Sequence, residues 1–381
     1  MGVRVRCTRF SGRGVLSVNP FPHIYYTAAA LAAIAALLAV CIKQRTYAYA
    51  ATATLIAPLL LAYLIGMYRI GGVDFENYEG YLGSQRDQIP DVGYRLLMDL
   101  AAAAGLNLSE FFLLQGLFSL GAVCLLAKKF RSDLVVTLTL YLLHGAIVRD
   151  FSQSRSALAL AIYFVALAQE RKVLYVALTV AATSVHFSLV PLVFVYHWAR
   201  TVIGLQKGQV FFTVAPAVGL IASVSVLLPL LSLIDPRIEI YLNWAEDLYG
   251  NPVGSYSGML LLLLIAAICY RVERVTDDKD MRVFVIMIMY ALAIFIAFRE
   301  IAIFAFRLSN MVAVLYPFAV GRAVYLLKSV ERDRLHAGVA QHGLQDLVLS
   351  LALLGGLLLA IVVRSGSLDI LRDTQPALLA Y

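Results

Sequence analysis

The stretch VRDFSQSRSALALAIYFVALA, residues 148–168, joins a charged turn to a long apolar run. Arg149, Asp150 and Arg155 surround the polar turn, and apolar residues follow from Ala157. A charged side chain at membrane depth is costly, so such residues normally pair with one another or face a wet cavity. The same pattern recurs along the chain, and it predicts a membrane protein whose functional groups lie at the ends of its spans.

The composition assigns the whole chain to one class. Of its 381 residues, 61% are hydrophobic and 14% are charged, and the mean hydropathy is +0.81. Such a composition cannot cover a water-soluble surface, so we expect an all-α polytopic membrane protein. One crossing of the hydrocarbon core takes about 20 residues of helix, which predicts about twelve spans. The predicted spans are 24–42, 47–68, 109–127, 133–148, 156–170, 173–185, 187–203, 209–234, 258–271, 283–298, 302–321 and 345–363.

No polar stretch is long enough to form a soluble domain of about 50 residues. Residues 1–381 are therefore predicted to form a single integral membrane domain that ends in a tail, 364–381. Apolar residues at helical spacing near 91–105 predict an amphipathic helix along the membrane surface, although a packed connector fits the same pattern. The cysteines are scattered without metal-ligand spacing, and no metal or cofactor is expected. The longest polar stretches are 69–108, 235–257 and 322–344.

The distribution of basic residues predicts the orientation of the spans. Arg and Lys mark cytoplasmic loops, and with twelve spans the basic clusters all fall on one face. The loops 69–108 and 235–257, the turn at 149–155 and His186 then lie on the opposite, extracytoplasmic face. The arginines before the first span, which begin at Arg4, do not fit this orientation. The clusters are Lys43/Arg45, Lys128/Lys129/Arg131, Arg171/Lys172, Arg200/Lys207, Arg271/Arg274/Lys279/Arg282 and Arg322/Lys328/Arg332/Arg334.

This orientation depends on the stretch from Val173 to Trp198. As one helix it would be about 40 Å long, which is too long for one crossing and too short for two. Counting it as one crossing would place Arg322 and Arg334 outside. The charge rule therefore favours two short spans with a break near His186.

Carboxylates and tyrosines gather in the loop YRIGGVDFENYEGYL, residues 68–82. Carboxylates can hold and deprotonate hydroxyl groups, and tyrosine rings lie against sugar faces. These properties favour a sugar site, with a solvated acidic loop as the alternative. The candidate catalytic groups are Asp74 and Glu79, and the candidate sugar contacts are Arg69, Tyr78 and, in the following helix, Tyr94.

Arginines at the span ends form a second set of candidates. Arg149 and Arg155 flank the turn that opens a predicted span, and the rigid fork of a guanidinium suits a phosphate or diphosphate. Arg299 and Arg307 are eight residues apart, which on one helix would place them near the same face. We therefore regard all four as candidate diphosphate ligands. Interfacial snorkelling, or for Arg149 pairing with Asp150, is the alternative.

His186 lies in AATSVHFSLVPL, at the predicted break between two spans. An imidazole can exchange a hydrogen bond with a sugar hydroxyl or act as a general base near neutral pH. An isolated histidine more often has a structural role, and Val185, Phe187 and Leu189 offer it no polar partner within the span. We include His186 as a third candidate catalytic residue.

The order of these motifs is similar to that of the EpsG family, which belongs with the Wzy-type O-antigen and exopolysaccharide polymerases. The resemblance covers most of residues 47–320. Val73 departs from it, because a small or hydroxyl residue is more typical at that position. The matching stretches are Arg69 to Tyr78 with Gly72 and Asp74, Arg149 to Ala159, Ser184 to Ser188 with His186, and Phe306 to Tyr316 with Arg307.

The resemblance implies a GT-C-like membrane glycosyltransferase of the hexosyltransferase type. Such an enzyme moves a growing glycan from undecaprenyl diphosphate to a sugar hydroxyl of an incoming lipid-linked repeat unit. It implies a multi-pass protein of the bacterial inner membrane with its active site facing the periplasm. The expected partners are the undecaprenyl-diphosphate-linked oligosaccharide, membrane lipids and a chain-length regulator, and not nucleic acid. The implied roles are diphosphate binding by Arg149, Arg155 and Arg307, support by Arg299, and acceptor activation by Asp74 or His186.

Other functions fit parts of the pattern. A flippase or transporter for lipid-linked sugars would line a path with the same arginines, but no internal repeat is visible and the charges lie toward one face. A membrane O-acyltransferase would use His186 as its base and usually needs a second polar partner. A ligase that transfers glycan from undecaprenyl diphosphate shares the polymerase chemistry. The sugars, their linkage and the anomeric outcome are not determined by the sequence.

Overall fold

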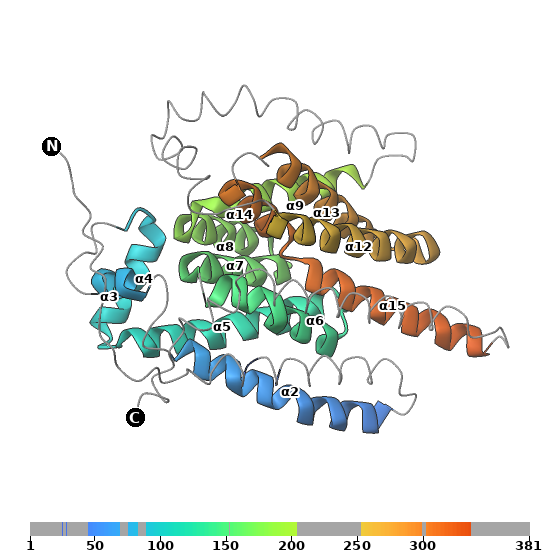
Figure 1. Ribbon diagram of the computed structural model, residues 1–381, viewed down its shortest axis with the longest axis horizontal. Helices are drawn as coiled ribbons and strands as arrows, with labels where there is room; N and C mark the ends of the chain where they lie inside the picture. The colour runs from blue at the N-terminus through green and yellow to red at the C-terminus, as the bar shows by residue number, and fades with distance from the viewer. Residues whose placement is uncertain are drawn as a thin grey trace.

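The computed structural model shows a bundle of helices, most of which run roughly side by side, with α3 and α4 at one end (Figure 1). No strand occurs in the part of the chain that the structure describes, which confirms the all-α class. The described residues are Tyr25, Ala28, 45–68, 75–82, 89–151, 153–203, 253–298 and 302–336.

The helices follow in two series along the chain. The first series is α2 (Arg45–Met67), α3 (Phe75–Leu82), α4 (Val92–Ala103), α5 (Leu108–Lys129), α6 (Leu134–Leu140), the π-helix η2 (Tyr141–Asp150), α7 (Ser154–Ala168) and α8 (Lys172–Val185). The second series is the 3-10 helix η3 (Phe187–Leu189), α9 (Val190–Val202), α12 (Val253–Thr276), α13 (Lys279–Ala297), α14 (Ala302–Ala313) and α15 (Tyr316–His336).

These helices coincide with the predicted spans wherever both can be compared. Three stretches are long and apolar enough to cross a membrane: Leu108–Lys129, Lys279–Ala297 and Arg307–Val330. The third stretch joins α14 to α15 across a turn at 314–315. The predicted spans 209–234 and 345–363, and all of 24–42 except Tyr25 and Ala28, lie outside the described residues. The count of twelve and the GT-C-like arrangement therefore stay predictions.

Several segments predicted as polar loops are helical instead. Helix α3 occupies part of 69–108, and α12 begins at Val253, inside the predicted loop 235–257. Helix α15 continues to His336, beyond the predicted end of its span at 321. The Lys328 ammonium is 2.8 Å from the Asp133 carboxylate, so the polar part of α15 is tied back to the bundle. Hydropathy misses this extension because an ion pair, rather than apolar burial, holds it.

The break predicted near His186 is present. Helix α8 ends at Val185, and His186 has an extended backbone with φ −155° and ψ 109°. Helix α9 follows with a proline in its first turn, where the missing N–H costs no helical hydrogen bond. A 2.6 Å hydrogen bond joins Tyr175 Oη, near the start of α8, to His197 Nε2, near the end of α9. The two helices therefore return on each other, and His186 lies at the tip of the hairpin.

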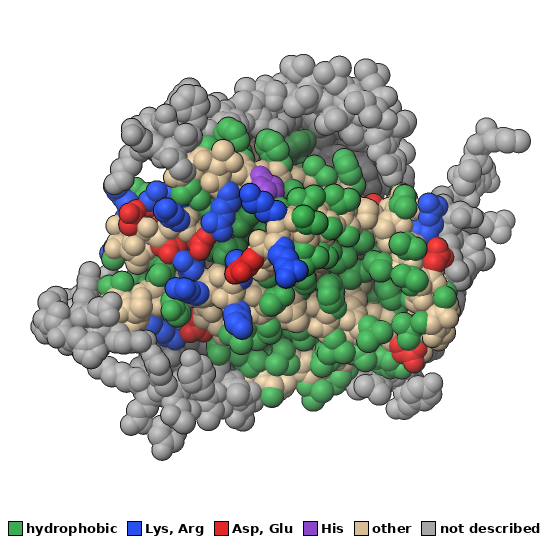
Figure 2. All heavy atoms as spheres, turned by 180° about the vertical axis from the view of Figure 1, so that it is seen from behind, with side chains coloured by type: hydrophobic (Ala, Val, Ile, Leu, Met, Phe, Trp, Pro, Cys, Tyr) green, Lys and Arg blue, Asp and Glu red, His purple; other side chains and the backbone are tan. Residues whose placement is uncertain are grey.

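Ion pairs gather at the end of the bundle opposite to His186. Arg200 of α9 is 2.9 Å from Asp280, and Arg322 of α15 is 2.6 Å from Asp278. Figure 2 shows the charged side chains interleaved on one side of the molecule, next to a broad hydrophobic surface. Exposed Tyr270 lies beneath the Arg274 guanidinium, as interfacial aromatic residues do at a membrane–water boundary. Arg200, Arg274 and Arg322, from three of the predicted basic clusters, thus lie at this end. The assignment of this end to the cytoplasm stays a prediction.

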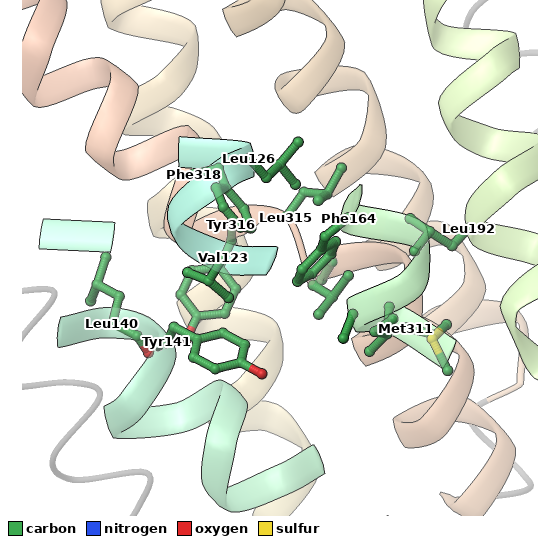
Figure 3. Packing of buried hydrophobic residues seen from close by; sticks show 14 of the residues in the cluster. Val123, Leu126, Leu140, Tyr141, Phe164, Leu192, Met311, Leu315, Tyr316 and Phe318 are labelled. Atoms are coloured by element: carbon green, nitrogen blue, oxygen red, sulfur yellow. Dashed lines mark hydrogen bonds between the residues drawn. The ribbon is translucent and has the colours of Figure 1, made fainter. Parts of the chain in front are cut away.

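The core lies between helices from both series. Side chains of α5, α7, α9, α14 and α15 converge there (Figure 3). The rings of Phe164 and Phe318 meet edge to face with their centroids 5.3 Å apart, and both side chains are buried. Because lipid is as apolar as the core, close packing of this kind is what associates helices in a membrane. The core therefore fixes where the helix ends lie, and with them the charged residues.

Candidate functional site

The candidate site lies at the end of the bundle that carries α3 and α4 (Figure 1). Helix α4 packs against α8 there, and the first turn of α7 and the hairpin tip at His186 lie beside them. Seven of the ten predicted site residues are described, and five of them lie around α3, α4, the first turn of α7 and the hairpin tip. These five are Tyr78, Glu79, Tyr94, Arg155 and His186.

Asp91 connects the elements of this site. Its Oδ2 atom is 2.8 Å from Arg155 Nη1 and 3.5 Å from His186 Nδ1. The backbone amide of Phe187 donates to the same carboxylate. The exposed fractions of the side chains are 13% for Asp91, 27% for Arg155 and 24% for His186. These three residues, which we call the Asp91 triad, form a charged cluster that solvent or a ligand can reach.

The backbone around Asp91 explains how the triad forms. Asp91 occupies the N-cap position of α4 but makes no capping hydrogen bond with its side chain. Gly93 lies so close to α8 that a Cβ atom there would be 2.3 Å from Ser184 Oγ and 2.7 Å from the Ser184 carbonyl carbon. Only glycine allows this approach, which brings Asp91 next to His186. The triad therefore depends on the close contact of α4 with α8.

The environment keeps the Asp91 carboxylate charged. Burial alone would raise its pKa, but the hydrogen bond with His186 and the charges of His186 and Arg155 outweigh burial. The pKa of Asp91 is consequently lowered below its usual value. A carboxylate stabilised by donors and cations in this way carries its charge at neutral pH.

Aromatic side chains support the triad from α3 and α4. Tyr78 and Tyr94 are buried, with ring centroids 5.9 Å apart. The Tyr78 hydroxyl hydrogen-bonds to Arg155, and the Tyr94 hydroxyl is 3.4 Å from Ser154 Oγ. Both rings thus position the start of α7, while their predicted role as sugar contacts stays a prediction.

Arg149 lies deeper in the bundle, at the end of η2. Its side chain is buried and donates from Nη1 to Gln153 Oε1 (2.7 Å) and Ser156 Oγ (3.0 Å). The alternative for Arg149 is a pair with Asp150. The Asp150 charge does act favourably on Arg149, although no ion pair between the two side chains is present in the described part of the chain. The Asp150 carboxylate instead accepts hydrogen bonds from the hydroxyls of Tyr63 (2.7 Å) and Tyr141 (2.9 Å).

Arg307 of α14 brings a second positive charge to Arg149. Arg149 Nη2 donates to the Arg307 backbone carbonyl (3.3 Å), and the two guanidinium charges repel each other. The Arg307 side chain is exposed. Within the described ranges neither guanidinium forms an ion pair with a carboxylate. We call Arg149 and Arg307 the arginine pair. The Asp150 charge acts on Arg149 without such an ion pair, and two guanidinium groups side by side favour binding of an anion.

The comparison with known families now bears on this geometry. The family model described as "EpsG family" matches residues 51–337. The chain belongs to the EpsG family. Membership indicates a membrane protein of the polysaccharide-polymerase type. Neither the curated proteins nor the solved structures contain a match to the chain.

The matched range of this EpsG-family protein contains both the Asp91 triad and the arginine pair. The other predicted site residues are placed less fully. Glu79 is exposed on α3, and Asp74, Arg69 and Arg299 lie outside the described residues. Helix α14, which carries Arg307, is described from Ala302. Because Arg299 is not among the described residues, the expectation that it shares a helix face with Arg307 stays a prediction. Among the described residues no group of His, Cys, Asp and Glu could hold a metal ion.

Asp91 is the functional residue that sequence reasoning missed. An aspartate directly before a helix is typical of an N-cap, and nothing in that pattern distinguishes it from a binding group. The expectation that His186 lacks a polar partner is also wrong, because Asp91 lies 95 residues away in sequence and in contact in space. The only local signal was Gly93, two residues after Asp91, which indicated a close backbone approach.

Proposed function

We propose that this EpsG-family protein is a polysaccharide polymerase of the bacterial inner membrane. It transfers the growing glycan from undecaprenyl diphosphate to a sugar hydroxyl of an incoming lipid-linked repeat unit at the periplasmic face. One observation carries the proposal. Two adjacent arginines with no described carboxylate in contact, and a histidine bound to a carboxylate, both lie in the family's matched range, on span ends away from the paired basic clusters.

The arginine pair suits the leaving group of this reaction. Undecaprenyl diphosphate leaves with negative charge, and preorganised donors in a water-poor site stabilise developing charge without reorganising. Gln153 and Ser156, which are both neutral, hold the Arg149 guanidinium in place. Arg307 is exposed beside it and meets the diphosphate first. We assign Arg149 and Arg307 to the diphosphate, with Arg299 as a supporting group.

His186 suits the acceptor. The bond between the anomeric carbon and the diphosphate oxygen breaks, and a bond from that carbon to the acceptor oxygen forms. The acceptor proton passes to His186, whose partly exposed ring can reach it. Asp74 and Glu79 are the alternative bases. Because Arg155 is already paired with Asp91, we place it on the acceptor side.

Exposed apolar side chains border the triad. Val92, next to Asp91, is 64% exposed, and Phe187, next to His186, is 74% exposed. Apolar side chains at such positions face lipid, so the polyprenyl chain of a lipid-linked sugar can remain in the bilayer while its diphosphate reaches the site. This arrangement supports a substrate that enters sideways from the membrane.

The test is a reaction with purified components. The protein in lipid nanodiscs is incubated with a synthetic undecaprenyl-diphosphate-linked repeat unit, and glycan length is read on a gel. We expect a ladder, with one undecaprenyl diphosphate released for each new glycosidic bond. A donor with a single phosphate is the control and should react poorly. Transport of the lipid-linked unit across vesicles without any ladder would overturn the proposal in favour of a flippase.

A membrane O-acyltransferase is the second candidate, because Asp91 gives His186 the polar partner that such an enzyme needs. It leaves the arginine pair without a role. Incubation with an acyl donor and the same repeat unit separates the two functions. Acylated repeat units without a ladder would favour the acyltransferase.

A further inference from the structure

We propose that Asp91 is a positioning residue for His186. Its carboxylate holds the imidazole with the proton on Nδ1, so that Nε2 is left to accept the proton of the acceptor hydroxyl. The inference rests on the proposed function, since it gives His186 its catalytic state.

The geometry sets the tautomer. His186 Nδ1, and not Nε2, faces Asp91 Oδ2 at 3.5 Å. A neutral imidazole carries one N–H, and a carboxylate can only accept, so the contact favours the Nδ1–H form. The other ring nitrogen then bears the lone pair that a general base requires.

Asp91 is itself held independently of His186. Arg155 Nη1 lies 2.8 Å from the same oxygen, and the Phe187 amide donates to the carboxylate from the residue after His186. The carboxylate thus connects α4, the first turn of α7 and the backbone of the hairpin tip. It can hold the ring in one orientation while a sugar binds.

The triad has features that a purely structural ion pair does not need. Asp91 gives up the capping bond that its position before α4 offers. His186 lies where the helix is interrupted and its backbone is extended, with its ring 24% exposed. An ion pair between Asp91 and Arg155 would join α4 to α7 without any histidine.

The first experiment compares D91N with D99N. Asp99 is on the same helix, eight residues further along, about 12 Å along the axis. Loss of a residue that orients a metal-bound histidine typically costs about 10- to 100-fold, and we take the same range for a residue that orients a histidine base. We expect kcat to fall by that factor in D91N with KM little changed, and D99N to keep wild-type kcat. Equal kcat values for D91N and D99N would overturn the proposal.

A double-mutant cycle tests whether Asp91 acts through His186. Residues that act as a unit have non-additive effects. In the H186Q background, D91N should therefore cause little further loss of kcat. A full additional loss would mean that Asp91 acts independently of His186, and it would overturn the proposal.

Nitrogen-15 NMR of histidine-labelled protein in nanodiscs gives a readout that needs no polymerase activity. The chain has six histidines, and loss of one signal in H186Q assigns His186. We expect the Nδ1–H form in the wild type and in D99N, and a shift toward Nε2–H in D91N. If the tautomer of His186 is unchanged in D91N, the inference about Asp91 is wrong, even if the wild type makes a ladder. If the wild type makes no ladder, the proposed function is wrong.

D91E serves if D91N fails to fold. It keeps the charge on a side chain longer by one methylene, so we expect the wild-type tautomer with a smaller loss of kcat. An Nε2–H form in a folded D91E would overturn the proposal.

Discussion

The two ends of the helix bundle differ in how they satisfy their arginines. At the end where α12 turns into α13, Arg322 is 2.6 Å from Asp278 and 3.2 Å from Asp280. At the other end, Arg149 donates to neutral acceptors and a carbonyl, and Arg307 stays exposed. Paired charges hold helices together, whereas arginines without a carboxylate in contact attract an anion. We therefore regard the first end as a structural clamp and propose that the second is a binding site.

Each end also has one aspartate with a lowered pKa. Burial would raise the pKa of Asp278, but hydrogen bonds from Arg322 and from the amides of Met281 and Asp280 lower it. Burial would also raise the pKa of Asp91, but His186 and Arg155 lower it. The partner of Asp278 holds one helix to another, while one partner of Asp91 is a histidine with an accessible ring. The contrast leads to the following predictions, in order of decreasing effect.

Removing a charge from the arginine pair should have the largest effect. R149Q keeps hydrogen-bonding capacity but loses the charge, and loss of a donor to a developing negative charge typically costs about 100-fold or more in kcat. We expect the glycan ladder to shrink to single repeats. R274Q, which removes an exposed arginine from the clamp end, is the control and should give a normal ladder. Equal ladders from folded R149Q and R274Q would contradict the contrast between the ends.

Removing an arginine from the clamp should affect stability instead of activity. The Arg322 and Asp278 side chains are only 10% and 15% exposed, and breaking a buried pair costs about 3–5 kcal/mol. R322Q should therefore unfold at a clearly lower temperature in detergent, with kcat per folded molecule unchanged. K328Q, at a more exposed pair, should lower it less. If R322Q were as stable as the wild type, the ion pair of Arg322 and Asp278 would not be a structural clamp.

Adding one methyl group at the site end should have an intermediate effect on both properties. In G93A the new Cβ would lie 2.3 Å from Ser184 Oγ, and overpacking of this kind costs about 1–3 kcal/mol. Helix α4 should move away from α8, so kcat falls as Asp91 leaves His186. In G121A the new Cβ has no atom within 4 Å, and that variant should be neutral in unfolding temperature and kcat. Matching behaviour of the two variants would refute the close α4–α8 contact.

Acidification should have the smallest and most gradual effect. Asp91 and Asp278 have lowered pKa values in the folded protein, compared with about 3.9 in an unfolded chain. Their stabilisation is present above the unfolded pKa and is lost as pH falls through the folded pKa. The unfolding temperature should therefore be flat from about pH 7 to pH 5 and fall below about pH 4. In D278N the unfolding temperature should fall less below about pH 4. If it fell as much as in the wild type, Asp278 would not contribute to the acid destabilisation.

Much of the fold was predictable because helices in lipid must be apolar over their whole length. The runs that became α5, α7 and α13 were visible for that reason. The hairpin tip at His186 was predicted from the length of 173–198, which is too great for one crossing, and from the basic residues that flank both its ends. Hydropathy could not predict α3 or the end of α15, because polar contacts, of Tyr78 with Arg155 and of Lys328 with Asp133, help to hold these segments against the bundle.

The sequence by itself determined the class of the protein, the run of its spans and its EpsG-type order of motifs, because these depend on local composition and spacing. Only the tertiary structure decided which charges meet. Asp91 joins His186 and Arg155 from distant segments. Asp150 accepts hydrogen bonds from Tyr63 and Tyr141, while Arg149 donates to Gln153 and Ser156. A side chain's partners depend on which helix ends are packed side by side, and packing between distant helices leaves no mark on the spacing of residues along the chain.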